Sequence, residues 1–251
     1  MNPNIEDLPE FPFFTIITAV YNGEKTLQRT IDSVLSQSYK NFEYIIVDGG
    51  STDNTLSIIK KNEHPSLTWI SEPDNGVYDA FNKGIKLANG KLVGIINSDD
   101  WYEPEALLQI RNAYDIEKNA HIYYGLARFL NSNNEILAVQ GYTELSLNYG
   151  MISHPTCFVK RETYDNVATF DTKYQIAADY NLMLTLKRAG CKFHFIEVIL
   201  ANFSEGGIST TNRLDSRKET LQIKFNHKLI SYLRYKIGQL QLWIIRTLGF
   251  N

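Results

Sequence analysis

The sequence predicts an α/β fold in which helices flank a mostly parallel central sheet and a helical extension follows at the C-terminus. Short apolar runs alternate with amphipathic segments over residues 13–118, an order typical of parallel strands joined by helical crossovers. At 251 residues, 43% of them hydrophobic, the chain is long enough for one large domain and an appendage. We expect a disordered tail at 1–12, the main domain at 13–215 and an amphipathic extension at 216–251.

The first half of the chain carries four strand patterns, each followed by a helix pattern. Apolar runs rich in β-branched and aromatic residues, bounded by turn residues, predict strands at 13–19, 42–47, 67–70 and 92–96. Apolar residues at helical spacing, with capping residues and Asn-Gly or Pro at the ends, predict helices at 24–37, from 51–53 through 61, at 76–88 and at 104–118.

The pattern loosens after residue 118. Strand-like runs at 121–130 and 135–140 enclose an Asn-rich turn and predict a meander. We then expect a short strand with a basic end at 153–161, a helix ending at Gly190 and a last strand at 193–200. The composition of 203–209 is typical of a flexible loop, in which Gly206 and Gly207 are candidate hinges of a lid.

Polar residues follow the predicted strands of the first half. They are Tyr21 and Asn22, Asp48, residues 72–75, and Asp99 with Asp100. Parallel sheets bind ligands beyond the carboxyl ends of their strands, so we expect these side chains to share one rim. The adjacent carboxylates Asp99 and Asp100 favour a divalent cation, Mg²⁺ or Mn²⁺, that shares its ligands with phosphate oxygens. Taken alone, a solvated turn that caps the next helix explains the pair equally well.

Several functional classes are disfavoured by what the sequence lacks. The net charge of −3 and the absence of a basic-aromatic motif argue against a nucleic-acid partner. No glycine-rich dinucleotide or P-loop motif is present. Cys157 and Cys191 lack metal-ligand spacing and fit a reducing compartment. Without a secretory signal pattern or a long apolar run, we expect a cytoplasmic protein that at most lies on a membrane surface.

The tail at 223–251 combines an apolar helical face with interspersed Lys and Arg. A basic amphipathic helix of this kind binds at a membrane interface. Packing on the main domain or on a second subunit is an equally good interpretation.

The chain resembles the bacterial family 2 glycosyltransferases of the GT-A fold. The resemblance rests on the segments 18–22, 30–39, 46–55, 72–80, 97–101 and 177–180, which follow the family order and span roughly residues 13–210. It implies a metal-dependent, inverting transfer of a sugar from a nucleoside diphosphate sugar to a glycan or lipid-linked acceptor. The implied context is bacterial surface polysaccharide synthesis in the cytoplasm, at the inner face of the membrane. UDP is the first choice of nucleotide, with GDP or dTDP as alternatives.

The resemblance also implies roles for individual residues. Those assigned to the nucleotide and donor are Ala19, Tyr21 and Asp48 at the base, Glu72 and Asp74 in the nucleoside pocket, and Asp79 at the donor sugar or ribose. Asp100 is the favoured metal ligand and Asp99 a ribose or outer contact, although the two could exchange. Asp179 matches the general base that deprotonates the acceptor hydroxyl.

Two positions depart from the family pattern. Asn97 stands where many relatives have an acid, and Ala178 where a Glu is frequent. The first implies a weakly held Mn²⁺ or Mg²⁺ delivered with the nucleotide, and the second removes a neighbour that helps to orient the acceptor.

Further assignments stay open. His154 and Trp101 are candidate acceptor contacts, with a structural histidine and a packed tryptophan as alternatives. A degenerate module that binds nucleotide sugar or glycan without turnover is one competing function. A nucleotidyltransferase is another, although residues 21–25 are a poor match to its usual loop.

Overall fold

A computed structural model describes residues 11–204 and 212–248. Most of the tail expected at 1–12 and the candidate hinges Gly206 and Gly207 lie outside the described residues. The strands are β1 Phe14–Val20, β2 Phe42–Asp48, β3 Leu67–Ser71, β4 Leu92–Ile95, β5 Trp101–Tyr102, β6 Ile122–Leu130, β7 Ile136–Gln140, β8 Phe158–Lys160 and β9 Phe193–Ser204. The helices are α1 Leu27–Leu35, α2 Thr55–Lys61, α3 Val77–Leu87, α4 Ala106–Ile116, α5 Arg161–Asn166, α6 Ala178–Arg188, α8 Arg213–Asn226 and α9 Tyr232–Thr247, with 3-10 turns at Glu144–Asn148 and His154–Thr156.

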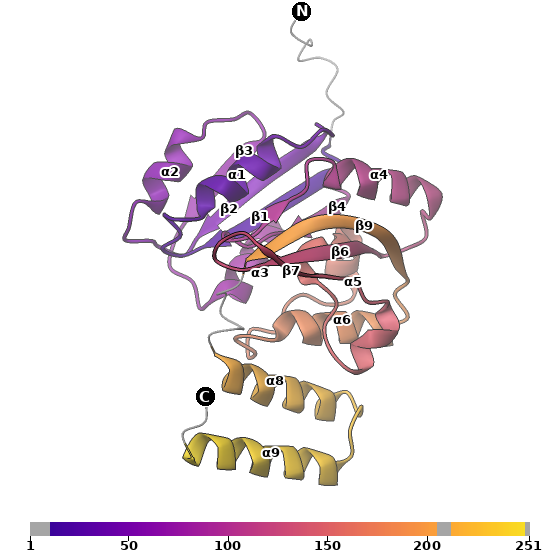
Figure 1. The fold of residues 1–251 in the computed structure, drawn as a ribbon. Helices are drawn as coiled ribbons and strands as arrows, with labels where there is room; N and C mark the ends of the chain where they lie inside the picture. Colours follow the sequence, from indigo (N-terminus) through magenta and orange to yellow (C-terminus); the bar gives the residue numbers. More distant parts are fainter. Residues whose placement is uncertain (1–10, 205–211, 249–251) are drawn as a thin grey trace, which may run out of the picture.

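The described strands form one sheet in the order β3-β2-β1-β4-β8-β6-β9-β5, with β7 paired on β6 (Figure 1). The four strands of the first half are parallel, as predicted, and Val20 lies opposite Asp48 at the carboxyl ends of β1 and β2. In the second half β8 runs antiparallel to both β4 and β6, while β9 runs parallel to β6. The predicted α/β class, with helices flanking the sheet, is confirmed.

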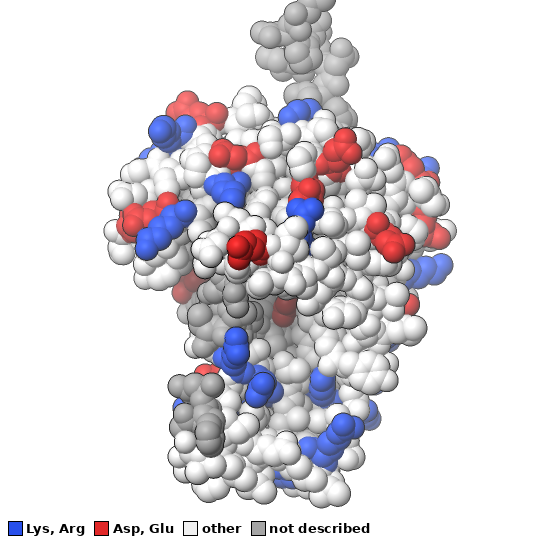
Figure 2. All heavy atoms as spheres, viewed as in Figure 1, with Lys and Arg blue, Asp and Glu red and all other residues white. Residues whose placement is uncertain are grey.

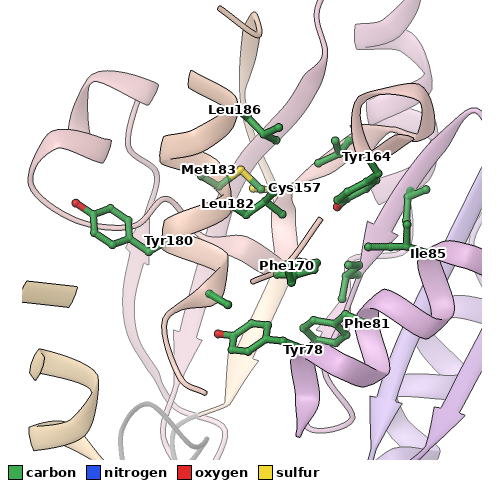
Figure 3. Close-up of a cluster of buried hydrophobic side chains, with 14 of the residues drawn as sticks. Tyr78, Phe81, Ile85, Cys157, Tyr164, Phe170, Tyr180, Leu182, Met183 and Leu186 are labelled. Carbon is green, nitrogen blue, oxygen red and sulfur yellow. The ribbon is translucent and has the colours of Figure 1, made fainter. Parts of the chain in front are cut away.

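Two apolar layers cover the two faces of the sheet. Every residue of β1 is buried, because alternate side chains enter opposite layers. Phe14 and Ile16 pack with the layer that contains α1 and α4, whereas Ile17 and Ala19 pack with α3 and α6. Figure 3 shows the second layer, where side chains of α3 and α6 meet around Phe170. The carboxyl end of β1 is therefore packed between apolar layers on both faces of the sheet.

The segment expected as a strand at 153–161 is three short elements. Residues His154–Thr156 form a 3-10 turn with Pro155 near its start, which leaves only Phe158–Lys160 for β8. Arg161 begins α5 instead of ending the strand. The prediction was wrong here because a long segment was assigned to one element on its apolar residues alone.

The last strand is longer than expected. Phe203 and Ser204, expected in a flexible loop, continue β9, where Ser204 lies opposite Leu130 of β6. The two-residue strand β5, which the sequence did not suggest, pairs with β9 at Asn202 and Ala201. These pairings bring the end of β9 beside the acidic pair at 99–100.

The C-terminal residues form a helical hairpin, in which α8 packs against α6 and α9 packs against α8 (Figure 1). The expected boundary between residues 215 and 216 falls inside α8. Ile223 of α8 is fully buried in the same apolar layer as α6. Within residues 11–204 and 212–248, no helix combines the length and the apolar character that a membrane span requires.

Candidate active site

A cavity of about 1100 Å³ opens at the carboxyl ends of the parallel strands. The turn after β1, the residues after β4 and the start of α3 form part of its wall. Residues 150–155, the segment before α6 and the start of α8 form much of the rest. Six of the residues predicted from the sequence line this one cavity: Ala19, Tyr21, Asp74, Asp99, His154 and Asp179. A volume of this size accommodates a nucleotide-sized ligand together with a second molecule.

The two adjacent carboxylates after β4 differ in their surroundings. Asp99 lines the cavity, whereas Asp100 is buried beneath it. The Asp100 carboxylate accepts bonds from Ser204 N at 3.0 Å and from Asn97 Nδ2 at 3.0 Å. Burial, followed by the neighbouring charge of Asp99, raises the pKa of Asp100 to about 8. Burial also raises the pKa of Asp99.

Arg29 of α1 fixes the backbone of this pair, a role that the sequence did not reveal. Its guanidinium donates to Asp99 O and to Ser204 Oγ, each at 2.8 Å, and lies 3.6 Å from the centre of the Trp101 ring. Trp101 is thereby covered by Arg29 and is not part of the cavity wall. Its predicted contact with an acceptor stays a prediction.

Asp179 stands at the N-terminal end of α6. Its carboxylate accepts the backbone N–H of Tyr180 at 2.8 Å and lies 3.3 Å from the hydroxyl of Tyr78. Burial raises the pKa of Asp179, while the nearby His154 opposes that shift. The His154 ring stacks on Phe81, and burial lowers the pKa of His154 despite the charge of Asp179. The cavity therefore contains a carboxylate with raised proton affinity beside an imidazole that favours its neutral form.

Residues 15–174 match the model of the Glycosyl transferase family 2. The chain belongs to this family. It is 29% identical to a chondroitin synthase of Pasteurella multocida (strain Pm70) over 234 residues, which cover 90% of this chain and 24% of that protein. It is 28% identical over 206 residues to a PGL/p-HBAD biosynthesis glycosyltransferase of Mycobacterium bovis, with 80% of both chains covered. The chain spans about a quarter of the length of the chondroitin and hyaluronan synthases of Pasteurella multocida.

Solved structures show the same fold. S. aureus TarS 1-349 in complex with UDP-GlcNAc matches with a TM-score of 0.69 at 20% identity, covering 95% of this chain and 73% of that one. The mannosyltransferase PcManGT from Pyrobaculum calidifontis, in complex with GDP-Man and Mn²⁺, matches with a TM-score of 0.64 at 19% identity, covering 86% and 64%. The fold is the GT-A type that the sequence predicted.

Asp48 of this family 2 glycosyltransferase is buried and holds the loop that follows β2. Its carboxylate accepts the backbone N–H groups of Gly50 and Ser51 and the hydroxyls of Ser51 and Ser71, the last at 2.6 Å. Gly50 adopts a φ of 83°, which glycine allows at little cost. Asp48 is not on the cavity wall, and its predicted contact with the nucleotide base stays a prediction.

The acids around the start of α3 contact Lys83 or accept backbone N–H groups of the same loop. Lys83 Nζ lies 2.9 Å from Glu72 and 3.7 Å from Asp79, and Asp79 also accepts Asn75 N at 3.0 Å. Asp74 accepts Gly76 N at 2.9 Å and faces the cavity. Glu72 and Asp79 lie outside the wall, so Asp74 is the acid of this group that is placed to meet a ligand.

The acidic pair fits a divalent ion only if a ligand supplies further oxygens. No group of three His, Cys, Asp or Glu side chains within the described residues could hold a metal by itself. The donors that the structure gives to Asp100 are a neutral amide and a backbone N–H, which lower the pKa of that carboxyl but do not offset the effect of burial. Asp99 and Asp100 would hold Mn²⁺ or Mg²⁺ together with diphosphate oxygens, and the ion would neutralise charge on the leaving group.

Glu219 of α8 fixes the segment before Asp179. Its carboxylate accepts the backbone N–H groups of Gln175, Ile176 and Ala177 at 2.7, 2.9 and 2.8 Å. The Tyr78 hydroxyl donates to Ile176 O at 2.6 Å, so the same segment is tied to α3. Tyr78 lies within a motif that marks the family, but no sequence pattern pointed to Glu219.

Proposed function

We propose that this family 2 glycosyltransferase moves a sugar from a nucleoside diphosphate sugar to a hydroxyl of a glycan or lipid-linked acceptor, with inversion at the anomeric carbon. One observation carries the proposal: Asp99 and Asp179 line the same cavity. Asp74 and Ala19 also lie on its wall. Asp99 belongs to the candidate metal site, and Asp179 has the raised pKa that suits a general base.

In this mechanism Asp179 accepts the proton of the acceptor hydroxyl as its oxygen attacks the anomeric carbon. The bond from that carbon to the diphosphate oxygen breaks on the opposite face of the sugar, so the configuration inverts. Asp99 and Asp100 would hold a divalent ion, which would supply stabilisation of the charge on the departing diphosphate. The Tyr180 N–H donates to the Asp179 carboxylate, and the Tyr78 hydroxyl, which donates to Ile176 O, lies 3.3 Å from that carboxylate.

UDP is the nucleotide we expect, because TarS 1-349 binds UDP-GlcNAc on the same fold, and PcManGT with GDP-Man and Mn²⁺ supports the use of Mn²⁺. The curated relatives, which include chondroitin and hyaluronan synthases, support polysaccharide synthesis as the setting. We place the reaction in the cytoplasm, at the inner face of the membrane.

A screen of nucleotide sugars by thermal shift, with and without Mn²⁺, tests the donor. A donor that binds only the folded state raises the free energy of unfolding by about 2.7 kcal/mol when its concentration is a hundred times Kd. The melting temperature rises as a result. The Asp179→Asn variant is then expected to keep the donor-induced shift and to lose transfer.

Substantial transfer by Asp179→Asn would remove Asp179 from the role of base. Donor binding without transfer or donor hydrolysis by the unmodified chain, for every acceptor tried, would favour the binding module. The Asn97 amide on Asp100 is the feature that supports this second candidate.

A further inference from the structure

Helix α9 carries a second apolar stripe that no described part of the chain covers. Helix α9 packs on α8, and the residues of one side, Tyr235, Gly238, Leu242 and Ile245, are half-buried. There the Tyr235 ring stacks on Phe225 with 4.5 Å between centroids. The exposed stripe consists of Leu233, Ile237, Leu240, Ile244 and Leu248, which are 40–70% exposed. Their spacing of three or four residues places them on one face, opposite the packed side.

The surroundings of this stripe are basic. Arg234 and Lys236 flank it at helical spacing, and α9 contains no acidic residue. Residues 212–251 hold eight Lys and Arg against two Asp and Glu, whereas residues 1–211 hold 17 against 26. Figure 2 shows Lys and Arg over the surface that α8 and α9 form, while the rest of that face mixes both charges. The hairpin is thus a region of net positive charge in a molecule whose net charge is −3.

We propose that the outer face of α9 binds an anionic lipid bilayer, with its apolar stripe among the acyl chains and its Lys and Arg at the headgroups. An amphipathic helix without acidic residues matches both the apolar and the charged layers of such an interface. Trp243 and Tyr232, both more than 60% exposed, lie on the same helix and suit the headgroup boundary. A second copy of the hairpin would bring like charges together, which disfavours a symmetric dimer through this face.

The position of the hairpin relates this surface to the active site. Helix α8 separates α9 from the sheet (Figure 1), and Ser216 and Thr220 of α8 line the cavity. A bilayer bound to α9 therefore lies on the side of the molecule where α8 borders the cavity. This inference deepens the proposed function and rests on it, because the lipid-linked acceptor of the proposed reaction would lie in that bilayer.

Sedimentation of the full chain with vesicles tests the proposal without donor or acceptor. We expect binding to phosphatidylcholine vesicles that contain phosphatidylglycerol, little binding to phosphatidylcholine alone, and weakening by added salt. The triple variant I237Q, L240Q and I244Q, and the double variant R234Q and K236Q, are each expected to bind about tenfold or more weakly.

Matched controls use residues away from the hairpin. Ile116→Gln with Leu145→Gln removes exposed apolar side chains, and Lys60→Gln with Lys61→Gln removes exposed charges. Both pairs are expected to bind vesicles like the unmodified chain. Circular dichroism and the melting temperature of each variant report folding, because all these side chains are at the surface.

Vesicle binding that is absent, or that the triple variant retains, would overturn the proposal. A concentration-dependent dimer in light scattering that the triple variant dissolves would assign the stripe to a second copy and also overturn it. Because donor binding is measured separately by thermal shift, failure of vesicle binding leaves the proposed transferase activity standing, and failure of donor binding leaves the membrane surface standing.

Discussion

At the scale of single residues, three buried or half-buried aspartates show how partners decide what a carboxylate does. Asp48 receives N–H and O–H donors from its own loop and from Ser71, which suits a charged group with a structural task. Burial and the neighbouring charge of Asp99 raise the pKa of Asp100 to about 8, although two neutral donors and the charge of Arg29 oppose the shift. Asp179 has Tyr78 and a backbone N–H, faces the cavity and keeps a raised pKa.

The Asp100→Asn variant is expected to be more stable than the unmodified chain at neutral pH. The pKa of Asp100 is higher in the folded state than its ordinary value of 3.8. Its favourable contribution is therefore complete below pH 3.8 and is lost as the pH rises through about 8. The difference in melting temperature should grow across that range, by about 2–4 °C for each kcal/mol.

Thermal unfolding of both proteins between pH 4 and pH 8.5, without divalent ions, measures this difference. Mn²⁺ with a bound donor should narrow it, because the ion stabilises the charged form of Asp100 only in the unmodified chain. An equal melting temperature at all pH values would contradict the proposed cost of burying this carboxylate.

The pH dependence of transfer should have an acidic limb set by Asp179. Its raised pKa means that the base becomes protonated at a pH above the ordinary carboxyl value of 3.8, and kcat falls as the pH drops through that point. Measurement of kcat against pH at saturating donor tests this expectation. A limb at or below the ordinary value would mean that another group accepts the proton.

At the scale of elements, the buried strands were predictable because their physical signal is local. The apolar runs that became β1, β2 and β4 needed no knowledge of their partners, since strands covered on both faces are apolar throughout. The insertion of β8 between β4 and β6 was not predictable, because three residues carry too little pattern to fix a neighbour. The six-residue α5 was missed for a related reason, since its mixed polar sequence shows no period.

The candidate site also contains residues that the sequence predicted and residues that it did not. Family motifs identified Asp99 and Asp179, and the topology of parallel strands brought Asp99 and Asp74 to one rim. Arg29 and Glu219 were missed because each acts on backbone atoms, about 70 and about 40 residues away, that no local pattern records. Trp101 was suggested because aromatic rings stack on sugars, and the cover that Arg29 provides for one face of its ring could not be read from the sequence.

Loss of the Glu219 carboxylate is expected to lower kcat about tenfold to a hundredfold with little change in the KM for donor. Glu219 positions the segment 175–177 that precedes Asp179, and small displacements of a base cost rate more than binding. Steady-state kinetics of Glu219→Ala measure both constants. Glu219→Gln, which keeps one acceptor oxygen, should recover part of the loss.

Glu117→Gln is the matched control, because Glu117 also accepts a backbone N–H, from Asn119, but that contact does not involve the segment 175–177 that precedes Asp179. The control should leave kcat unchanged. An unaltered kcat in folded Glu219→Ala, or a change in KM alone, would show that the contact with α8 has no part in positioning the base.

At the scale of the whole molecule, the C-terminal hairpin belongs to the catalytic unit as well as to the outer surface. α8 contributes Glu219, Ser216 and Thr220 to the site, and its Ile223 is buried in the layer that holds α6. α9, in contrast, buries none of its residues completely. Within one hairpin, α8 thus packs on the core beside the cavity, whereas α9 lies at the outer surface.

Removal of residues 213–251 should therefore abolish transfer even to a water-soluble acceptor and lower the melting temperature. The apolar-stripe variants of α9 should keep that transfer. Activity assays with a water-soluble acceptor distinguish the two kinds of change. Full activity of the truncated chain would separate the hairpin from catalysis.

The uneven placement of charge makes the molecule an electric dipole. Residues 212–248 carry six more positive than negative charges, and residues 11–204 carry five more negative than positive ones. Near a negatively charged plane, such a particle turns before contact, within about one Debye length of roughly 10 Å. The end that bears α9 would arrive first, and the acidic remainder would be held away from the plane, so that a diffusing molecule reaches its working orientation without repeated collisions.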